Sequence, residues 1–425
     1  MAHILMIESW VGGTARLLPP MIKKLGHEYS FVTRNPSHYG AQEGKDHPVV
    51  AGAKNTIVTE TNDIDGLCEV LEGIHKREAF DAVLTICDYY ITTVTRVADR
   101  LELPHPFPKN STVARRKDQV RKALTQHGLA NPGFDVVNSV EEALHAGNDL
   151  GYPLVIKPTD LASSAFVRMV HNGDELRESC RAIMEFETNF RDQKRDTACL
   201  IEEYMSGEEV SVEAITIDGK TTIIGVTDKS ISGTPFFIED GHMFPAQLDD
   251  KLAEEACELA ESALEAIGFD NGISHTEIKL TERGPRIVEI NPRPAGNYIS
   301  ELIEHVTGKS LVEAFVRLAI GEKPSMIYER NGAGSAAIKF LMPDQGGVVK
   351  SISGIETLED NAHVTRWHLD AKVGGHVNEP IDNGCYIGHL VAVDPNGGAA
   401  RAIAENAAES LKIEVSTSEK EEVNE

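Results

Sequence analysis

Short apolar runs alternate with longer amphipathic stretches over the first hundred residues. We predict buried strands at residues 4–7, 29–32 and 82–86, and helices at 17–24 and 91–101. Regular alternation of strand and helix is typical of a parallel α/β layer. Pro104, Pro106 and Pro108 interrupt the pattern, so we place the end of a first α/β domain at residue 108.

The middle of the chain changes to a strand-rich pattern. A helix is predicted at 115–127, because the helical periodicity stops at Gly128 and Pro132 follows. Strands are predicted at 154–157, 199–204, 210–217, 221–226, 273–280 and 286–290, with a further helix at 250–267. Asp218 and Gly219 are a strong hairpin signal between two of these strands. Beyond Pro324 the strands become shorter (336–341, 364–368 and 386–393), and a helix is predicted at 399–411.

The composition excludes several classes of protein. The 41 Lys and Arg residues against 67 Asp and Glu give a formal net charge of −26, which disfavours nucleic acid and anionic membranes as partners. No apolar run is long enough to cross a bilayer. The first residues, MAHILMIES, lack the pattern of a secretory signal, so we expect a cytoplasmic protein. The six cysteines form no CxxC pair and are predicted to be reduced core residues.

Two familiar nucleotide motifs are incomplete. Gly12 and Gly13 follow the first predicted strand, but the third glycine of a dinucleotide fingerprint is missing. Residues 308–310, Gly-Lys-Ser, imitate the end of a P-loop without its first glycine, so we interpret them as a turn between two helices.

Two acidic residues interrupt otherwise apolar strands. Glu277 lies in HTEIKLT and Glu289 in VEINPRPAG, on strands that a short turn would make antiparallel neighbours. Asn291 points to the same face as Glu289. Two carboxylates and an amide oxygen are hard ligands that suit magnesium. In the alternative interpretation Glu277 pairs with Lys279. Glu289 then neutralises Arg293.

Two lysines, Lys117 and Lys157, are candidates for binding an anion. Lys157 ends the apolar run PLVIK, and a buried ammonium is costly unless it meets a negative group such as phosphate. Lys117 lies in the basic segment ARRKDQVRK, for which a solvated helix face is the default interpretation. The run TDLASSAFV after Lys157 has small and hydroxyl residues whose N–H groups can lie over phosphates, although this signal alone is weak.

Together these segments resemble the ATP-grasp ligases, and more narrowly the stand-alone L-amino-acid ligases that form dipeptides. The resemblance covers nearly the whole chain and rests on PLVIKP, IEEYMSGEEVSVE, HTEIKLT and VEINPRPAG. It implies an α/β and α+β architecture, with an ATP-grasp fold between an N-terminal parallel α/β domain and a small C-terminal α+β piece. The expected segments are the N-terminal domain 1–108, a central linker and helix 109–150, the small subdomain 151–228, the large subdomain with the metal site 229–324, the C-terminal subdomain 325–415 and an acidic tail 416–425.

The resemblance implies a nucleotide site. Lys117 and Lys157 would hold the phosphates of ATP, and Glu209 would bind the ribose hydroxyls. The hinge that contacts the adenine would consist of Glu202, Glu203, Tyr204 and Met205. An ordinary strand with an exposed acidic turn is the alternative for this hinge.

The resemblance also assigns the metal and the transferring group. Glu277, Glu289 and Asn291 match the magnesium ligands, with two ions expected and Mn²⁺ as a substitute. Arg293 matches the arginine held over the transferring phosphoryl group and the substrate carboxylate.

Two loops complete the implied site. In the segment 227–248 Lys229 would approach the phosphates, while Glu239 and His242 would line the substrate side. The alternative is a mobile surface loop with chance charges. The second loop, residues 159–167, retains Ser164 as a phosphate contact but departs from relatives, which often have glycine where this chain has Leu161, Ser163 and Phe166.

The implied reaction is amide formation through an acyl phosphate, with ADP and phosphate released. Tyr89, Gly296 and Asn297 are expected in the amino-acid pocket. His242 and His275 are candidates for the base that deprotonates the amine, although a hydrogen-bonded core histidine is the favoured interpretation of His275. The partners expected are amino-acid substrates and a second copy of the chain in a homodimer. The alternatives are a carboxylase or nucleotide-biosynthesis ligase of the same superfamily, or a non-catalytic ATP-binding regulatory module.

Overall fold

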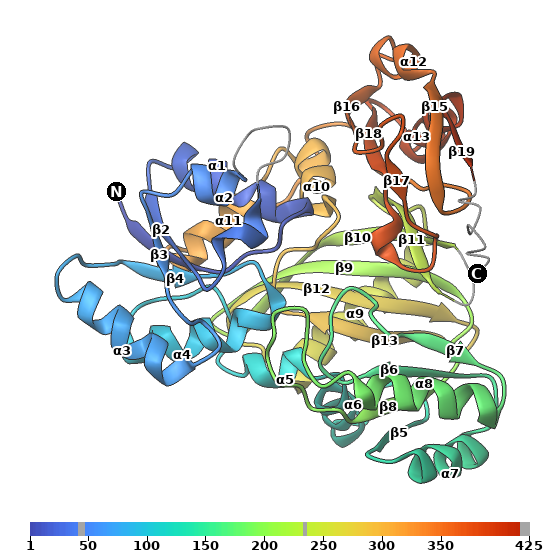
Figure 1. Cartoon of the computed structure of the whole chain (residues 1–425), viewed down its shortest axis with the longest axis horizontal. Coiled ribbons are helices and arrows are strands. Elements are labelled where there is room, and N and C mark those ends of the chain that lie inside the picture. Colours follow the sequence, from blue (N-terminus) through green and yellow to red (C-terminus); the bar gives the residue numbers. More distant parts are fainter. Residues whose placement is uncertain (41–46, 233–235, 417–425) are drawn as a thin grey trace, which may run out of the picture.

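The computed structural model describes residues 1–40, 47–232 and 236–416. The predicted acidic tail therefore lies outside the described residues from position 417 onward. Four sheets organise the described chain: an N-terminal sheet, a small central sheet, a large sheet that runs through the middle, and a short C-terminal sheet (Figure 1). In these residues no helix is long and apolar enough to cross a membrane.

The N-terminal sheet is parallel throughout, as the alternation of strands and helices predicts. Its order is β3-β2-β1-β4, and each neighbouring pair is parallel. The strands are β1 His3–Ile7, β2 Glu28–Thr33, β3 Asn55–Val58 and β4 Ala82–Leu84, and the helices are α1 Leu18–Lys24, α2 Pro48–Ala51, α3 Ile64–His75 and α4 Ile91–Leu101. β1 is buried at every position, which places the core of this domain on its central strand.

Two short helices connect this domain to the small central sheet. They are α5 Ser111–Arg115 and α6 Lys117–Gln126. The single helix predicted at 115–127 is therefore wrong at its start, because Arg116 has an extended backbone (φ −107°, ψ 108°) that separates the two helices. This break makes Lys117 the first residue of α6.

The small sheet is antiparallel and has the order β5-β8-β6-β7. Its strands are β5 Phe134–Val137, β6 Leu154–Pro158, β7 Arg168–Val170 and β8 Cys199–Glu203, and its helices are α7 Val140–Leu150 and α8 Gly173–Glu185. The helices pack against each other on one side of this sheet (Figure 1). Residues of β6 and β8 line a cleft together with residues of β12 and β13 of the large sheet.

The large sheet has eight antiparallel strands in the order β13-β12-β9-β10-β11-β14-β18-β16. Its strands are β9 Glu208–Ile217, β10 Lys220–Ser232, β11 Ile238–Phe244, β12 Gly272–Thr281, β13 Gly284–Asn291, β14 Ser335–Leu341, β16 Val364–Leu369 and β18 Gly388–Asp394. Three helices follow within this region: α9 Asp250–Ala266, α10 Ile299–Thr307 and α11 Leu311–Ala319. Gly308, in the predicted helix-to-helix turn, adopts a positive φ of 66° between α10 and α11.

The short C-terminal sheet has the order β17-β15-β19. Its strands are β15 Gly347–Ser353, β17 His376–Val377 and β19 Lys412–Ser416, accompanied by α12 Ile355–Glu359 and α13 Ala400–Ser410. α13 packs against β14 and β18, so the C-terminal segment closes one end of the large sheet (Figure 1).

The sheets divide the chain differently from the predicted segments. β5 and α7 fall in the expected linker 109–150 but belong to the small sheet. β9 and most of β10 fall in the expected small subdomain 151–228 but belong to the large sheet. β14, β16 and β18 of the expected C-terminal subdomain extend the same large sheet. Hydrophobic periodicity locates a strand without saying which neighbour it pairs with, so it does not reveal that the large sheet begins at β9.

Candidate active site

A cleft between the small and large sheets gathers most of the predicted nucleotide residues. The predicted residues that line it are Lys117, Lys157, Ser164, Glu202, Glu203, Tyr204, Met205, Glu209, Glu239, Glu277 and Glu289. The apolar side chains of Val155 and Val288 lie on opposite walls. A planar ring can therefore enter between two sheets while charged groups meet its substituents.

The β12–β13 hairpin places the two predicted metal carboxylates opposite each other. Glu277 is the cross-strand partner of Glu289, and His275 is the partner of Asn291. Facing partners in a sheet share a face, so the oxygens of Glu277, Glu289 and Asn291 can converge. The alternative ion pairs do not form: Lys279 binds Glu209 instead, and Arg293 binds an acid of the N-terminal domain.

Cations hold both carboxylates. Glu277 Oε1 lies 3.1 Å from Lys229 Nζ and 3.2 Å from His275 Nε2. Glu289 Oε2 lies 3.2 Å from Lys117 Nζ. Among the described residues no group of three or more His, Cys, Asp or Glu side chains is arranged to hold a metal ion. The donor set of two carboxylates and one amide nevertheless fits magnesium, because Mg²⁺ takes few protein oxygens and fills its remaining positions with water and phosphate.

Lys157 belongs to a buried charge network rather than standing alone. Its Nζ lies 2.6 Å from Glu202 Oε2, and Arg121 Nε donates to Glu202 Oε1 at 2.5 Å. Burial opposes ionisation of Glu202, but Arg121 and Lys157 together lower its pKa to about 2. Burial lowers the pKa of Lys157, although Glu202 opposes this. The carboxylate thus serves as a counter-ion that keeps a cation beside the cleft.

The expected hinge has one backbone N–H group, that of Met205, without a partner among the described residues. β8 ends at Glu203, whose N–H donates to Gly133 O at 2.8 Å, and Tyr204 N–H donates to Pro153 O at 3.4 Å. Met205 N–H makes no hydrogen bond within the described residues and lies on the cleft lining. A free N–H beside an apolar wall can read the edge of a purine.

Lys229 joins three acids from three strands. Its Nζ lies 3.0 Å from Glu209, 2.9 Å from Glu239 and 3.1 Å from Glu277, and its side chain is only 2% exposed. Burial lowers the pKa of Lys229, but these three carboxylates outweigh it and raise the pKa well above its usual value. The lysine therefore offsets part of the negative charge of the acids at the expected ribose, substrate and metal positions.

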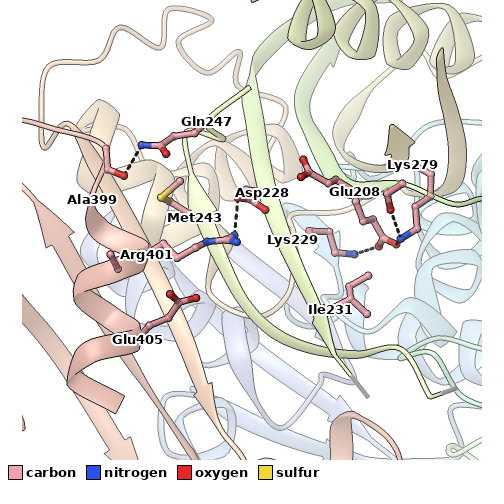
Figure 2. A pocket seen from close by; sticks show the side chains of 14 residues that line it. Glu208, Asp228, Lys229, Ile231, Met243, Gln247, Lys279, Ala399, Arg401 and Glu405 are labelled. Atoms are coloured by element: carbon pink, nitrogen blue, oxygen red, sulfur yellow. Dashed lines mark hydrogen bonds and ion pairs between the residues drawn. The ribbon is translucent and has the colours of Figure 1, made fainter. Parts of the chain in front are cut away.

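A second cavity of about 810 Å³ continues from this point toward the C-terminal helix. Figure 2 shows Lys229 and Lys279 on one side of it and Arg401 of α13, which pairs with Asp228 at 2.7 Å, on the other. Glu209 lines both cavities, so the expected ribose acid stands where the cleft opens toward the C-terminal subdomain.

The expected substrate residues form a compact polar group. Asn297 Nδ2 donates to Glu239 and lies 3.4 Å from His242 Nε2. His242 is 2% exposed and sits in β11, so the alternative of a surface loop with chance charges is wrong at this position. The C-terminal subdomain adds Tyr386, whose hydroxyl donates to Glu239 O at 2.7 Å. Gly296 precedes Asn297 in the sequence and has open space beside its Cα.

Both ring nitrogens of His275 contact carboxylates. Its Nδ1 is 2.9 Å from Glu213 Oε1 and its Nε2 is 3.2 Å from Glu277 Oε1. Burial opposes protonation of His275, but Glu213 and then Glu277 raise its pKa to about 9. With both nitrogens bound to carboxylates, His275 is arranged to orient Glu277 rather than to accept a proton from an amine.

Arg293 is held by an acid that sequence patterns did not mark. Its Nε donates to Asp88 Oδ2 at 2.7 Å, and Asp88 also pairs with Arg115 at 3.1 Å. Burial opposes ionisation of Asp88, but Arg293 and Arg115 lower its pKa to about 2. Asp88 and Arg293 are 205 positions apart. No local spacing connects such residues, so only the folded chain reveals the pair.

The loop 159–167 is fixed against the N-terminal domain. Leu161 and Ala162 are buried, and Ala162 N–H donates to the hydroxyl of Tyr89 at 3.3 Å. Lys117 Nζ donates to Leu161 O at 2.7 Å. Tyr89, expected in the amino-acid pocket, thus contacts the loop that is expected to bind phosphate.

Three family models match successive parts of the chain. An ATP-grasp N-terminal domain matches residues 23–105, an ATP-grasp domain matches 150–301, and an L-amino acid ligase C-terminal domain 2 matches 339–416. Their order follows the N-terminal sheet, the cleft and the C-terminal subdomain described above.

Curated relatives are similar at low identity. Alanine–anticapsin ligase of Bacillus subtilis is 29% identical over 266 residues, which cover 58% of this chain and 56% of that enzyme. The match thus spans little more than half of that relative. L-arginine-specific L-amino acid ligase of Bacillus subtilis is 23% identical over 327 residues, covering 76% of this chain and 77% of that enzyme.

Solved structures share the fold. An L-amino acid ligase from Bacillus licheniformis superposes with a TM-score of 0.81 at 21% identity, covering 98% of this chain and 99% of that one. A biotin carboxylase domain from Hydrogenobacter thermophilus, solved with MgADP, gives 0.72 at 16% identity, covering 97% and 91%. At these identities the likeness establishes the fold alone.

Proposed function

The chain belongs to the ATP-grasp superfamily, and we propose that it is an ATP-dependent ligase that joins an amino acid to an L-amino acid through an amide bond. The observation that carries the proposal is the cleft itself. It combines two lysines and a facing pair of carboxylates with a C-terminal subdomain of the L-amino acid ligase type.

The reaction proposed has two steps. A carboxylate oxygen of the first amino acid attacks the γ-phosphorus of ATP, the bond to the bridging oxygen breaks, and ADP leaves. The neutral amine of the second amino acid then attacks the acyl carbon, the bond to the phosphate oxygen breaks, and inorganic phosphate leaves as the amine loses a proton. The first step turns a poor leaving group into a good one, so no protein nucleophile is required.

The charged residues of the cleft supply the electrostatics. Lys117 and Lys157 would hold phosphate oxygens, and Arg293 Nη2, which makes no hydrogen bond within the described residues, would bind the transferring group. Glu277, Glu289 and Asn291 would hold Mg²⁺, which when bound offsets the charge that develops on the phosphates. We propose two ions, with Mn²⁺ able to replace them.

The polar group at Asn297 would receive the first amino acid. The carboxylate of Glu239 suits an ammonium group, and His242 and Asn297 offer further polar contacts. Arg293 would then meet the opposite, carboxylate end. His242 has Nδ1 buried without a hydrogen-bond partner in the described residues, which makes it a better candidate than His275 for a proton-accepting role.

A phosphate-release screen tests the proposal. Wild-type protein is mixed with ATP, Mg²⁺ and pairs of L-amino acids, and ADP, phosphate and dipeptide are measured. We expect the three products in equal amounts for at least one pair. ADP formed with bicarbonate in the absence of amino acids would favour a carboxylase instead. Tight ATP binding with no ADP under any condition would favour a regulatory module.

Two further features of the protein are proposals of the same kind. We expect a cytoplasmic location, where ATP and free amino acids are available. We also expect a homodimer, for which light scattering or sedimentation at micromolar concentration gives a direct measurement.

A further inference from the structure

Asp88 is a buried acid on which three segments of the chain converge. It opens the short 3₁₀ turn Asp88–Tyr90 after β4, and its side chain is fully buried. Its Oδ2 accepts from Arg293 Nε at 2.7 Å and from Trp10 Nε1 at 2.9 Å. Its Oδ1 accepts from Arg115 Nη1 at 3.1 Å. All three donors are directional N–H groups, so the carboxylate is held in one orientation.

These contacts also fix the plane of the Arg293 guanidinium. Asp88 binds its Nε, and its Nη1 donates to Pro294 O at 3.1 Å. Its Nη2 makes no hydrogen bond within the described residues, and the side chain keeps 15% of its surface exposed. A planar guanidinium with two nitrogens bound must present the third in a fixed direction. That third nitrogen is the one left for an anion.

The next residue ties a second part of the site to the same turn. The Tyr89 hydroxyl accepts the N–H of Ala162 in the loop 159–167 at 3.3 Å. The Tyr89 ring lies 5.4 Å from that of Trp10, which itself donates to Asp88. One turn of the N-terminal domain therefore contacts both the arginine and the phosphate loop.

We propose that the Asp88–Tyr89 turn is a positioning element for phosphoryl transfer, in which Asp88 aims Arg293 at the transferring group and Tyr89 holds the phosphate loop. The kinetic consequences rest on the proposed ligase function, whereas the geometry does not. Both residues act through others, so neither is a catalytic residue.

Asp88→Asn is the first test, because Asn has nearly the shape of Asp without its charge. We expect kcat to fall about 10- to 100-fold, the range found when a residue that orients a site ligand is replaced. KM for ATP should change little. In an Arg293→Ala background the same substitution should have no further effect on turnover, since the group it orients is absent. Additive losses in the double variant would overturn the proposal.

Glu301→Gln is the matched control. Glu301 pairs with Arg366 at 2.7 Å, its side chain is 19% exposed, and it links α10 to β16 rather than to the cleft. We expect unchanged kcat and KM in this variant. An equal fall in kcat would show that the loss of any partly buried ion pair has this effect, which would refute a specific role for Asp88.

Tyr89→Phe separates the second half of the proposal from a substrate-binding role. Loss of one hydrogen bond to the loop should raise KM for ATP about 5-fold with kcat little changed. A rise confined to the KM of an amino acid would place Tyr89 in the amino-acid pocket and contradict its role in holding the loop.

A structural measurement keeps this inference distinct from the ligase function. In ¹⁵N-labelled protein, the Arg293 Nε–H signal is identified by its absence in Arg293→Lys. This proton should exchange slowly with solvent in the wild type and much faster in Asp88→Asn. Equal exchange rates in the wild type and Asp88→Asn would refute the positioning role even if dipeptide forms. Faster exchange in Asp88→Asn, with no dipeptide formed by the wild type, would refute only the proposed reaction.

Discussion

Glu202→Gln tests the buried charge network behind the cleft. The Glu202 carboxylate is shared by Lys157 at 2.6 Å and Arg121 at 2.5 Å, and Glu202 is 1% exposed. Gln keeps the shape and one acceptor but removes the charge. Two buried cations are then left beside each other without their counter-ion, and this arrangement is strongly unfavourable.

The pKa of Glu202 gives the magnitude. A fall from 4.5 to about 2 corresponds to about 3 kcal/mol in favour of the ionised, folded form. Breaking a buried ion pair by removing one partner costs about 3–5 kcal/mol, which agrees. Because the pKa of Glu202 is depressed on folding, the stabilisation is complete above pH 4.5 and is lost as the pH falls toward 2. The difference between wild type and Glu202→Gln should shrink over the same interval.

Hydrogen exchange followed by mass spectrometry measures the effect where it occurs, because a chain of several domains need not unfold in one step. Amides of β6 and β8 should lose about 3 kcal/mol of protection at pH 7, while the N-terminal sheet is unaffected. Glu203→Gln is the matched control: its side chain is 37% exposed and its partner Arg283 is 64% exposed, so less than about 1 kcal/mol should be lost. Equal losses in the two variants would refute the argument from burial.

Three other substitutions have expected outcomes. Glu289→Ala should abolish ADP release at every Mg²⁺ concentration with the circular dichroism spectrum retained, whereas Glu282→Ala, in the exposed turn of the same hairpin, should leave turnover unchanged. Lys229→Met should lower the protection of amides in β9, β11 and β12 against hydrogen exchange by about 3 kcal/mol at pH 7 and by less at pH 4, because Glu239 and Glu277 lose the buried ammonium that holds their pKa values down and so take up protons more readily. Asn297→Leu removes a donor to Glu239 and should change the ranking of amino acids by kcat/KM, with KM for ATP unaltered.

Local patterns predict what depends on neighbours in sequence. The parallel N-terminal layer follows from short apolar runs separated by amphipathic helices, and the facing of Glu277 and Glu289 follows from two strands and a short turn. Both inferences need only the period of a strand and the length of a connection. The matching family models confirm the predicted fold class but do not test the position of any individual side chain.

Charge partners escape the same patterns because they come from distant segments. The sequence predicts an anion such as phosphate beside Lys157 but does not identify Glu202 as its counter-ion, nor Arg121 of α6 as the second cation that shares this acid. Asp88 lies in a stretch, ICDYY, that carries no motif. Its partner Arg293 lies 205 positions further along the chain. A buried charge requires compensation, but the sequence does not say which residue provides it.

In the loop 159–167, non-glycine residues occupy positions where relatives often have glycine, and contacts with distant segments hold them there. Ser163, Ser164 and Phe166 adopt φ values of 61°, 55° and 60°. Glycine reaches this region freely, whereas other residues lose about 1–2 kcal/mol each, so the loop cannot hold its path through local preference. Phe166 packs 4.9 Å from the Phe186 ring beyond α8, and backbone bonds to Tyr89 and Lys117 secure the other end.

These contacts predict a loop whose shape is set before any ligand binds. A glycine-rich loop would sample many backbone conformations, and a ligand would have to select one of them at a cost in conformational entropy. Here three non-glycine residues are strained and the contacts that offset the strain come from the N-terminal domain, α6 and the end of α8. Lys117 contributes to this support while also pairing with Glu289. The loop is therefore coupled, through the Lys117 ammonium, to Glu289, one of the two carboxylates expected to hold the metal.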